Sequence, residues 1–416
     1  MKKEQYMYQF SASHSLSTLV THVGEDNHPH YTHVSPIYQT STFNFPDVAT
    51  GAGIVARTEA GYYYTRLGNP NLDHLARKIS ILEGLDLIRQ QPDVDPMSMV
   101  AGQVFTSGMA AITAVLLSLL KSGDTIVAQE AVYSATFTFL KDIAPTLGIQ
   151  VAWVRDITPD GWQAAFTAHP NARLAYAETP ANPTMAMVDL QAVAEIAHQY
   201  GAWLAVDNTF ATPYCQRPLS LGADIVAHST TKFLSGHGAL TGGAVVSKHP
   251  DYIQNSLYKF VKVLGGIPSP FDAWLANLGL KTFELRMQRH CDNAMEVARF
   301  LATHPAVERV YYPGLEGDPG HAVATRQMHA YGGMLSFELK GGMEAGIRLM
   351  ERVRLATLAV SLGNVDTLIE HPASMTHGPV PREDRLNQGI TDGLVRLSVG
   401  IENLPDILAD LAQGLM

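Results

Sequence analysis

Short apolar runs alternate with segments of helical periodicity along most of this chain, beginning near residue 70. The runs are three to five residues long, which favours buried strands, and we expect strands at Thr125 to Ala128, Gln150 to Val154, Arg173 to Ala177, Trp203 to Val206 and Ile225 to Ala227. Between and around them, apolar residues spaced three and four apart predict helices near residues 72–83, 108–120, 136–147 and 190–200. Gly201 follows the last of these, where a glycine ends many helices.

This alternation predicts an α/β fold with a mostly parallel central sheet and helices on both faces. Residues 1–68 are polar, aromatic and rich in glycine and proline, and they predict an extended N-terminal arm that packs on a neighbouring subunit. We expect a large domain over residues 69–268. A smaller C-terminal α+β domain is expected over residues 269–416, opening with a long helical stretch toward His304. The polar residues 88–99 predict a surface loop.

Composition narrows the class of protein further. The 416 residues are 46% hydrophobic, and 39 acidic against 29 basic side chains give a net charge of −10, which argues against disorder and against a nucleic-acid partner. The longest apolar stretch, Ala110 to Leu120, is too short to span a membrane. The N-terminus lacks the apolar core of a signal peptide, and Cys215 and Cys291 are too few for a disulfide framework. We therefore expect a cytoplasmic protein.

Residues with reactive or polar side chains come directly after the predicted strands in the sequence. Seven polar residues lie just beyond the carboxyl ends of those strands: Tyr133, Glu178, Asn182, Asp207, Ser229, Thr231 and Lys232. In an open parallel sheet, ligands bind at that edge, so these side chains should converge. The N-terminus of the helix that begins near Gly108 should lie at the same edge.

The set suits a phosphorylated pyridine aldehyde. Lysine forms a Schiff base with a carbonyl, and a carboxylate such as Asp207 keeps a pyridine nitrogen protonated, so the ring can accept electrons. The backbone N–H groups of Gly108 and Met109 at a helix start, with nearby hydroxyl groups, can hold a phosphate. Singly, each residue has an ordinary structural explanation, such as a solvated lysine or an aspartate in a turn. Their shared position at the strand ends favours a cofactor site.

Several motifs resemble the Cys/Met-metabolism family of enzymes that depend on pyridoxal 5′-phosphate (PLP), which includes methionine γ-lyase, cystathionine γ-lyase, cystathionine γ-synthase and O-acetylhomoserine sulfhydrylase. Residues 228–237, HSTTKFLSGH, are similar to the family's PLP-lysine signature. The other matching segments, in order, are YTRLGNP at 64–70, SGMAA at 107–111, VDNTF at 206–210, HPASMTH at 371–377 and RLSVG at 396–400. The resemblance implies the aspartate-aminotransferase-like fold, known as fold type I.

The resemblance also implies how the cofactor is held. Lys232 would carry PLP and move protons, Tyr133 would stack on the ring and act as an acid or base, and Asp207 would pair with the ring nitrogen. The phosphate would be held by residues of two segments: Gly108, Met109, Ser229 and Thr231.

Two further groups of residues take their roles from the family. Tyr64 and Arg66 would reach the phosphate in a neighbouring subunit, within a homotetramer built from two catalytic dimers. Arg396 would bind the substrate carboxylate in a bidentate fork, helped by Ser361 and Asn182.

The implied reaction is α,γ-elimination of methionine or a related sulfur amino acid to a thiol, a 2-oxo acid and ammonia, with methionine γ-lyase as the nearest member. Val360 stands where the cystathionine enzymes usually have a glutamate that receives a distal ammonium group, so it favours an uncharged tail. Ala135 replaces a cysteine typical of methionine γ-lyases, and residues 263–270, VLGGIPSP, look more like cystathionine γ-lyase. A γ-replacement transferase acting on O-acetyl- or O-succinylhomoserine, and cystathionine γ-lyase, stay open as alternatives.

The histidines of the arm do not predict a metal site. His22, His28, His30 and His33 lie close together in sequence, but no HExxH spacing accompanies them. We expect no metal.

Overall fold

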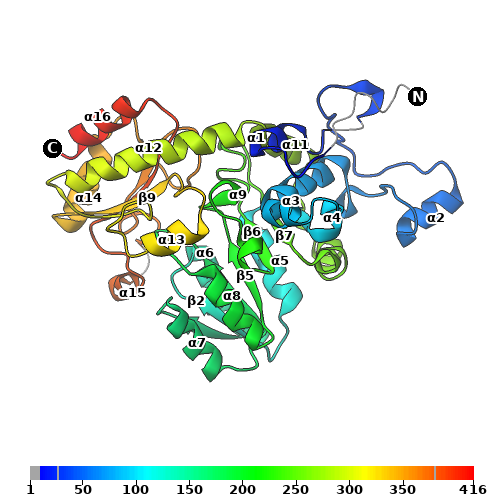
Figure 1. Ribbon diagram of the computed structural model, residues 1–416, viewed down its shortest axis with the longest axis horizontal. Coiled ribbons are helices and arrows are strands. Elements are labelled where there is room, and N and C mark those ends of the chain that lie inside the picture. Colours follow the sequence, from blue (N-terminus) through cyan, green and yellow to red (C-terminus); the bar gives the residue numbers. More distant parts are fainter. Residues whose placement is uncertain (1–9, 26–27, 379–380) are drawn as a thin grey trace.

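The computed structural model describes residues 10–25, 28–378 and 381–416, and within these ranges it contains a seven-stranded and a five-stranded sheet (Figure 1). The larger sheet has the order β1-β7-β6-β5-β4-β2-β3. Its strands are β1 (Ala101–Phe105), β2 (Thr125–Gln129), β3 (Gln150–Val154), β4 (Leu174–Glu178), β5 (Trp203–Asp207), β6 (Ile225–His228) and β7 (Gly243–Ser247). β7 runs antiparallel to both of its neighbours, whereas β6, β5, β4, β2 and β3 are parallel. The prediction of a mostly parallel sheet is confirmed.

Helices cover both faces of this sheet (Figure 1). They are α3 (Pro70–Gln90), α4 (Pro96–Met99), α5 (Gly108–Leu119), α6 (Ser134–Thr138), α7 (Pro159–Ala168), α8 (Leu190–Gln199), α9 (Thr212–Cys215) and α10 (Tyr258–Leu264). Successive side chains of a strand point to opposite faces, and β2 shows the result. Ile126 and Ala128 join the apolar cluster that contains Ile112 of α5, whereas Val127 joins the cluster that contains Val193 of α8.

Caps fix where the helices next to the strand ends begin. The Ser107 hydroxyl accepts a hydrogen bond from the Ala110 N–H at 3.1 Å and starts α5, and Asp189 accepts from the Ala192 N–H and starts α8. α5 therefore begins at Gly108, three positions after the end of β1.

The C-terminal part of the chain begins with α11 (Pro270–Leu280) and α12 (Phe283–Thr303) and contains the smaller sheet. The strands of this sheet are β8 (Val307–Tyr311), β9 (Met334–Leu339), β10 (Thr357–Leu358), β11 (Leu368–Glu370) and β12 (Leu394–Ser398), in the order β10-β11-β12-β9-β8. The accompanying helices are α13 (His321–Gln327), α14 (Gly342–Arg352), α15 (Arg382–Asn387) and α16 (Leu404–Gly414). Apolar residues of α12, α14 and α16 pack with those of β8, β9 and β12 in a separate cluster.

Predicted and observed elements agree best in the parallel strands, each of which ends within one residue of its predicted bounds. β1 and β7 were not predicted. The predicted helix at 136–147 is instead α6 followed by a π-helical stretch (Phe139–Ile143) and a 3₁₀ stretch (Ala144–Leu147). α3 continues to Gln90, so the predicted loop at 88–99 shrinks to the residues between α3 and α4. The long helical stretch expected before His304 consists of two helices, α11 and α12.

The N-terminal segment is not uniformly extended. α1 (Leu16–His22) buries Leu16, Leu19 and Val20 in the same apolar cluster as residues of α3, because these side chains lie on one face of the helix. α2 (Val48–Ala56) lies away from the two sheets at one end of the molecule (Figure 1). None of the helices in the described part of the chain combines the length and apolar character needed to cross a membrane.

A buried arginine joins the helices of the C-terminal part to the segment that follows β6. The guanidinium of Arg286 on α12 donates to the carbonyls of Phe233 at 2.7 Å, Leu234 at 3.2 Å and Gly279 at 2.9 Å. Gly236 lies so close that a Cβ there would overlap the Arg286 guanidinium. The position of Lys232, the residue before Phe233, therefore depends on α12.

We expect Arg286→Leu to lower the free energy of unfolding by about 3 kcal/mol, because it leaves buried carbonyls without donors. The matched control is Arg299→Leu on the same helix, where the side chain is 62% exposed and pairs with Glu296. That control should change the free energy of unfolding by less than about 0.5 kcal/mol. Urea denaturation followed by circular dichroism measures both, and similar midpoints for the two variants would contradict the prediction.

Candidate active site

The carboxyl ends of the parallel strands open into a cavity of about 430 Å³ that also borders the smaller sheet. The residues that line it include Ser107, Gly108, Met109, Tyr133, Glu178, Asn182, Asp207, Thr209, Ser229, Thr231, Lys232, Val360, Ser361, Glu370, His377 and Arg396. All of the predicted site residues except Tyr64 and Arg66 are in this set. The structure therefore brings together residues that are up to 288 positions apart in sequence (Gly108 to Arg396).

Lys232 lies in the loop after β6 with its ammonium group inside the cavity. The Lys232 Nζ donates to the Ser361 hydroxyl at 2.7 Å. Burial, and then the positive charge of Arg396, lower the pKa of Lys232 to about 8. A lysine with this pKa is partly neutral near pH 7 to 8, and the neutral amine is the nucleophile that adds to an aldehyde.

Asp207 ends β5 as a buried carboxylate. It accepts a hydrogen bond from the Thr209 N–H at 2.9 Å. Burial raises the pKa of Asp207 above its usual value, while Thr209 and His228 oppose the rise. A cation placed against Asp207 would offset the cost of burying its charge, and a protonated ring nitrogen is such a cation.

The start of α5 and the loop after β6 form a cradle for an anion. A Cβ on Gly108 would lie 2.8 Å from the Cβ of Ser229, so the close approach of the two segments requires glycine at position 108. Gly108 and Met109 at this helix start line the same cavity as Ser229, so backbone N–H groups of a helix N-terminus and a hydroxyl are available there for an anion. Thr231 also lines it, but its hydroxyl donates to the Gly242 carbonyl and accepts from the Gly242 N–H. Thr231 thus shapes the cradle by holding the loop.

Arg396 reaches the cavity from β12 of the smaller sheet. Its Nη1 donates to the Asn182 side-chain oxygen at 3.0 Å, and its Nη2 donates to the Ser361 carbonyl at 2.6 Å. Ser361 has a φ of 81°, a left-handed conformation that is uncommon outside glycine. The residue presents its hydroxyl to Lys232 and its carbonyl to Arg396, which places it between the two charges.

Tyr133 caps the cavity at the start of α6, with 42% of its surface exposed. Its N–H donates to one carboxylate oxygen of Glu178 at 2.8 Å, and the Asn182 N–H donates to the other, also at 2.8 Å. Burial, and then the charge of Asp207, raise the pKa of Glu178. Glu178 fixes two predicted site residues relative to each other, a role that the sequence did not predict.

Glu370 is a site residue that the sequence did not predict. It lies on β11 opposite Arg396 in the strand register, and its Oε1 is 3.2 Å from the Arg396 Nη1. A glutamate directly before the HPASMTH segment was the available signal. Pairing across a sheet joins residues that are distant in sequence, so that signal could not indicate the contact.

Tyr64 and Arg66 lie elsewhere on the molecule. Arg66 donates to the Lys262 carbonyl, and its guanidinium lies over the Tyr64 ring, 5.5 Å from the centroid. Tyr64 is 41% exposed. Among the residues that the structure describes, neither lines the cavity that holds Lys232 of the same chain.

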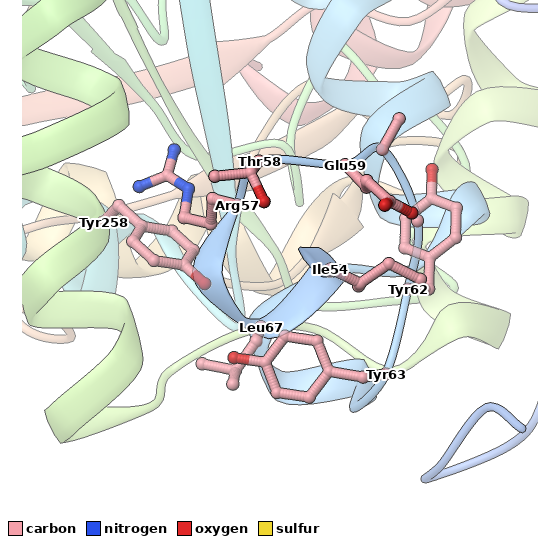
Figure 2. Close-up of a pocket in the computed structure, with 11 residues that line it drawn as sticks. Ile54, Arg57, Thr58, Glu59, Tyr62, Tyr63, Leu67 and Tyr258 are labelled. Atoms are coloured by element: carbon pink, nitrogen blue, oxygen red, sulfur yellow. The ribbon is translucent and has the colours of Figure 1, made fainter. Parts of the chain in front are cut away.

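A second hollow, of about 450 Å³, is lined by residues close to these in the sequence, among them Ile54 of α2, Tyr62, Tyr63 and Leu67 (Figure 2). Its wall includes Arg57, whose guanidinium donates to the Gln254 carbonyl at 3.0 Å and lies 4.6 Å from the centroid of the Tyr258 ring. Figure 2 shows Arg57 beside Tyr258, with Tyr63 and Leu67 on the opposite side of the hollow. These contacts attach the exposed arm to α10 of its own chain.

The cavity with Lys232 fits PLP and an amino acid. It joins an amine of lowered pKa, a buried carboxylate for a ring nitrogen, an anion cradle, and a guanidinium for a carboxylate. In the described ranges, no group of three or more His, Cys, Asp or Glu side chains is placed to hold a metal ion.

Comparison with known proteins agrees with this fit. The family model described as Cys/Met metabolism PLP-dependent enzyme matches residues 17–416. An L-methionine gamma-lyase of Fusobacterium nucleatum subsp. polymorphum is 47% identical over 403 residues, which is 97% of this chain and 98% of the relative. A cystathionine gamma-lyase of Bacillus subtilis is 42% identical over 91% of this chain and 93% of its own.

Solved structures lead to the same family. The crystal structure of cystathionine gamma synthase from Xanthomonas oryzae pv. oryzae, in complex with aminoacrylate and cysteine, superposes with a TM-score of 0.88 at 38% identity, over 97% of this chain and 98% of the other. Since the family model and these relatives span nearly the whole sequence, this chain belongs to the Cys/Met metabolism family of PLP-dependent enzymes, and its cofactor is pyridoxal 5′-phosphate.

Proposed function

We propose that this enzyme is a carbon–sulfur lyase that converts methionine, or a related sulfur amino acid, and water into a thiol, a 2-oxo acid and ammonia. The observation that carries the proposal is Val360, an apolar residue that lines the cavity beside Ser361. An apolar wall suits a thioether and leaves a distal ammonium group unpaired. The similarity to L-methionine gamma-lyases, at 43–47% identity, supports the same assignment.

PLP, when bound, supplies an electron sink that stabilises negative charge at Cα and Cβ. Lys232 is the residue that holds it, and its amine moves protons at these carbons. Asp207 keeps the ring nitrogen protonated. Tyr133, which lines the cavity, would stack on the ring and would serve as an acid or base near the leaving thiol. The start of α5, with Gly108 and Met109, and the loop with Ser229 and Thr231 bind the phosphate.

Arg396 binds the substrate α-carboxylate in this proposal. Its planar guanidinium offers a fork that matches a carboxylate. Asn182 and the Ser361 carbonyl accept hydrogen bonds from this guanidinium, so its orientation is set before substrate arrives. The substrate is thereby placed with its Cα near the Lys232 amine.

Oligomerisation completes the site. We place Tyr64 and Arg66 at the phosphate in a neighbouring subunit of a homotetramer, in which residues 1–68 form the contacting arm, 69–268 the cofactor domain and 269–416 the C-terminal domain. The exposure of Tyr64 and the position of α2 away from the two sheets support this arrangement. The cytoplasm is the proposed location.

A γ-replacement transferase is the second candidate, because it would use the same site residues with a sulfur nucleophile in place of water. Methionine γ-lyases typically have a cysteine where this chain has Ala135, and the VLGGIPSP segment at 263–270 looks more like cystathionine γ-lyase. The transferase and cystathionine γ-lyase are therefore tested as alternatives. The similarity to a cystathionine gamma synthase is a further reason.

The proposal predicts that purified enzyme with PLP releases methanethiol and 2-oxobutanoate from methionine in equal amounts. Lys232→Ala should lower this rate by about 1,000-fold or more, because the group that moves the proton is lost. Lys340→Ala serves as the control, since the Lys340 ammonium lies on the surface and donates to the Pro305 carbonyl.

A panel of methionine, homocysteine, cystathionine, cysteine and acylated homoserines is scored by the release of thiol and 2-oxo acid. Turnover confined to acylated homoserine with a thiol acceptor would replace the lyase by the transferase.

Val360→Glu should shift the preference toward cystathionine. A carboxylate at the cavity wall pairs with the distal ammonium group, and we expect the ratio of kcat/KM for cystathionine to that for methionine to rise about tenfold. Val360→Gln, which has a similar volume and no charge, is the control and should raise the ratio far less. Equal kcat/KM ratios in the two variants would show that the size of the side chain at position 360, rather than its charge, selects the substrate tail.

A further inference from the structure

Glu370 and Arg396 form a buried ion pair inside the cavity. Glu370 is 2% exposed and Arg396 5% exposed, and both line the cavity that holds Lys232. Their contact, 3.2 Å from Oε1 to Nη1, follows from their position opposite each other on β11 and β12. The Glu370 carboxylate therefore supplies a counter-charge to the same guanidinium that is proposed to receive the substrate.

The ion pair is incompletely satisfied. Within the described ranges, the second carboxylate oxygen of Glu370 and the Nε of Arg396 are both buried without a hydrogen-bond partner. Buried polar atoms are normally paired, and an unpaired one is costly. A protonated Glu370 would bear a hydrogen that can be donated, and a substrate carboxylate would offer acceptors to the guanidinium.

The balance of charge among Glu370, Arg396 and the substrate carboxylate decides which protonation state of Glu370 suits a bound substrate. An ionised Glu370 and Arg396 are together neutral, so a substrate carboxylate would bring an uncompensated negative charge into a buried site. With a proton on Glu370, the guanidinium and the substrate carboxylate compensate each other. Substrate binding and protonation of Glu370 therefore favour one another.

The charged and titratable groups around Glu370 come from several elements. Arg396 lies on β12, Lys232 in the loop after β6, His377 in the segment after β11, and Tyr133 at the start of α6. Burial raises the pKa of Glu370, although Arg396, Thr376 and Lys232 oppose the rise. Burial, and then Arg396, lower the pKa of His377 to about 4, so this histidine is neutral at physiological pH and adds no positive charge.

We infer that Glu370 takes up a proton when a substrate α-carboxylate binds to Arg396, and that it thereby makes substrate binding pH-dependent. This inference rests on the carboxylate-binding role proposed for Arg396. Glu370 is a positioning residue here, because it acts through the guanidinium and leaves the reacting atoms to other groups.

The sign of the pH effect follows from the linkage. A carboxylate ligand raises the pKa of Glu370 further, so binding is strongest where Glu370 is already protonated. As the pH rises past the pKa of Glu370 in the free enzyme, the dissociation constant increases by up to about tenfold per pH unit. The increase ends where Glu370 ionises in the complex as well.

The test uses the PLP-loaded enzyme and 4-(methylsulfanyl)butanoate, which is methionine without its amino group. Its inhibition constant is measured from pH 6 to 9 for the wild type and for Glu370→Gln, which keeps the shape of the side chain and cannot ionise. We expect the wild-type constant to rise with pH and that of the variant to stay flat. At the alkaline end, the variant should bind the inhibitor about tenfold more tightly. Values of KM for substrate should follow the same pattern, with smaller changes in kcat.

A second measurement needs no variant. In weakly buffered solution with an indicator dye, binding of 4-(methylsulfanyl)butanoate to the wild type should take up as much as one proton per site, with no uptake for the uncharged 4-(methylsulfanyl)butanamide. A wild type that binds the carboxylate without proton uptake, or a variant that retains the wild-type pH profile, would overturn the inference. Weaker binding by Glu370→Gln at every pH would do so too, since it would make Glu370 only a structural support of Arg396.

The Arg396→Lys variant separates this result from a failure of the proposed function. If the inhibitor does not compete with substrate, and Arg396→Lys leaves its inhibition constant unchanged, the carboxylate-binding role of Arg396 is wrong. If the inhibitor competes with substrate, and its inhibition constant changes in Arg396→Lys but not in Glu370→Gln, only the proton uptake by Glu370 is wrong.

Discussion

A charge that leaves water must find a partner, and this requirement organises the cavity. Lys232, Asp207, Glu370 and Arg396 all project into a space that excludes most solvent. Each is held by a short contact with a neighbouring group. Thr209 donates to Asp207, and Ser361 contacts both Lys232 and Arg396. Because an isolated buried charge is costly, the geometry of the site is set by these pairings as much as by the backbone.

The parallel sheet provides the place where the pairings occur. β4, β5 and β6 end side by side in register, so Glu178, Asp207 and the loop with Lys232 come to one edge. The start of α5 adds the N–H groups of a helix terminus at the same edge. The smaller sheet faces this edge with Arg396 on β12, and Arg286 on α12 links the C-terminal part to the loop after Lys232.

Most of the central sheet could be predicted because strands buried on both faces are short apolar runs, which the sequence displays directly. β1 was missed because it begins Ala-Gly-Gln and shows neither an apolar run nor alternation, and β7 because it follows a glycine-rich turn. The residues proposed to hold the cofactor could be placed at one edge because each follows a strand or lies in a motif. The role of Glu178 and the presence of Glu370 in the cavity could not be predicted, since they depend on contacts to Asn182, Tyr133 and Arg396 that only the folded chain creates. The role of Tyr64 and Arg66 stays a prediction, because it involves a second copy of the chain.

The cavity draws its two halves from different sheets, and they touch where Lys232 donates to Ser361 and where Arg396 donates to Asn182. Groups suited to the cofactor belong to the larger sheet, whereas Val360, Ser361, Glu370 and Arg396, which face the substrate side, belong to the smaller sheet or the segments around it. Mutations in the smaller sheet can thus alter which amino acid is accepted, while the residues of the larger sheet that suit the cofactor stay the same.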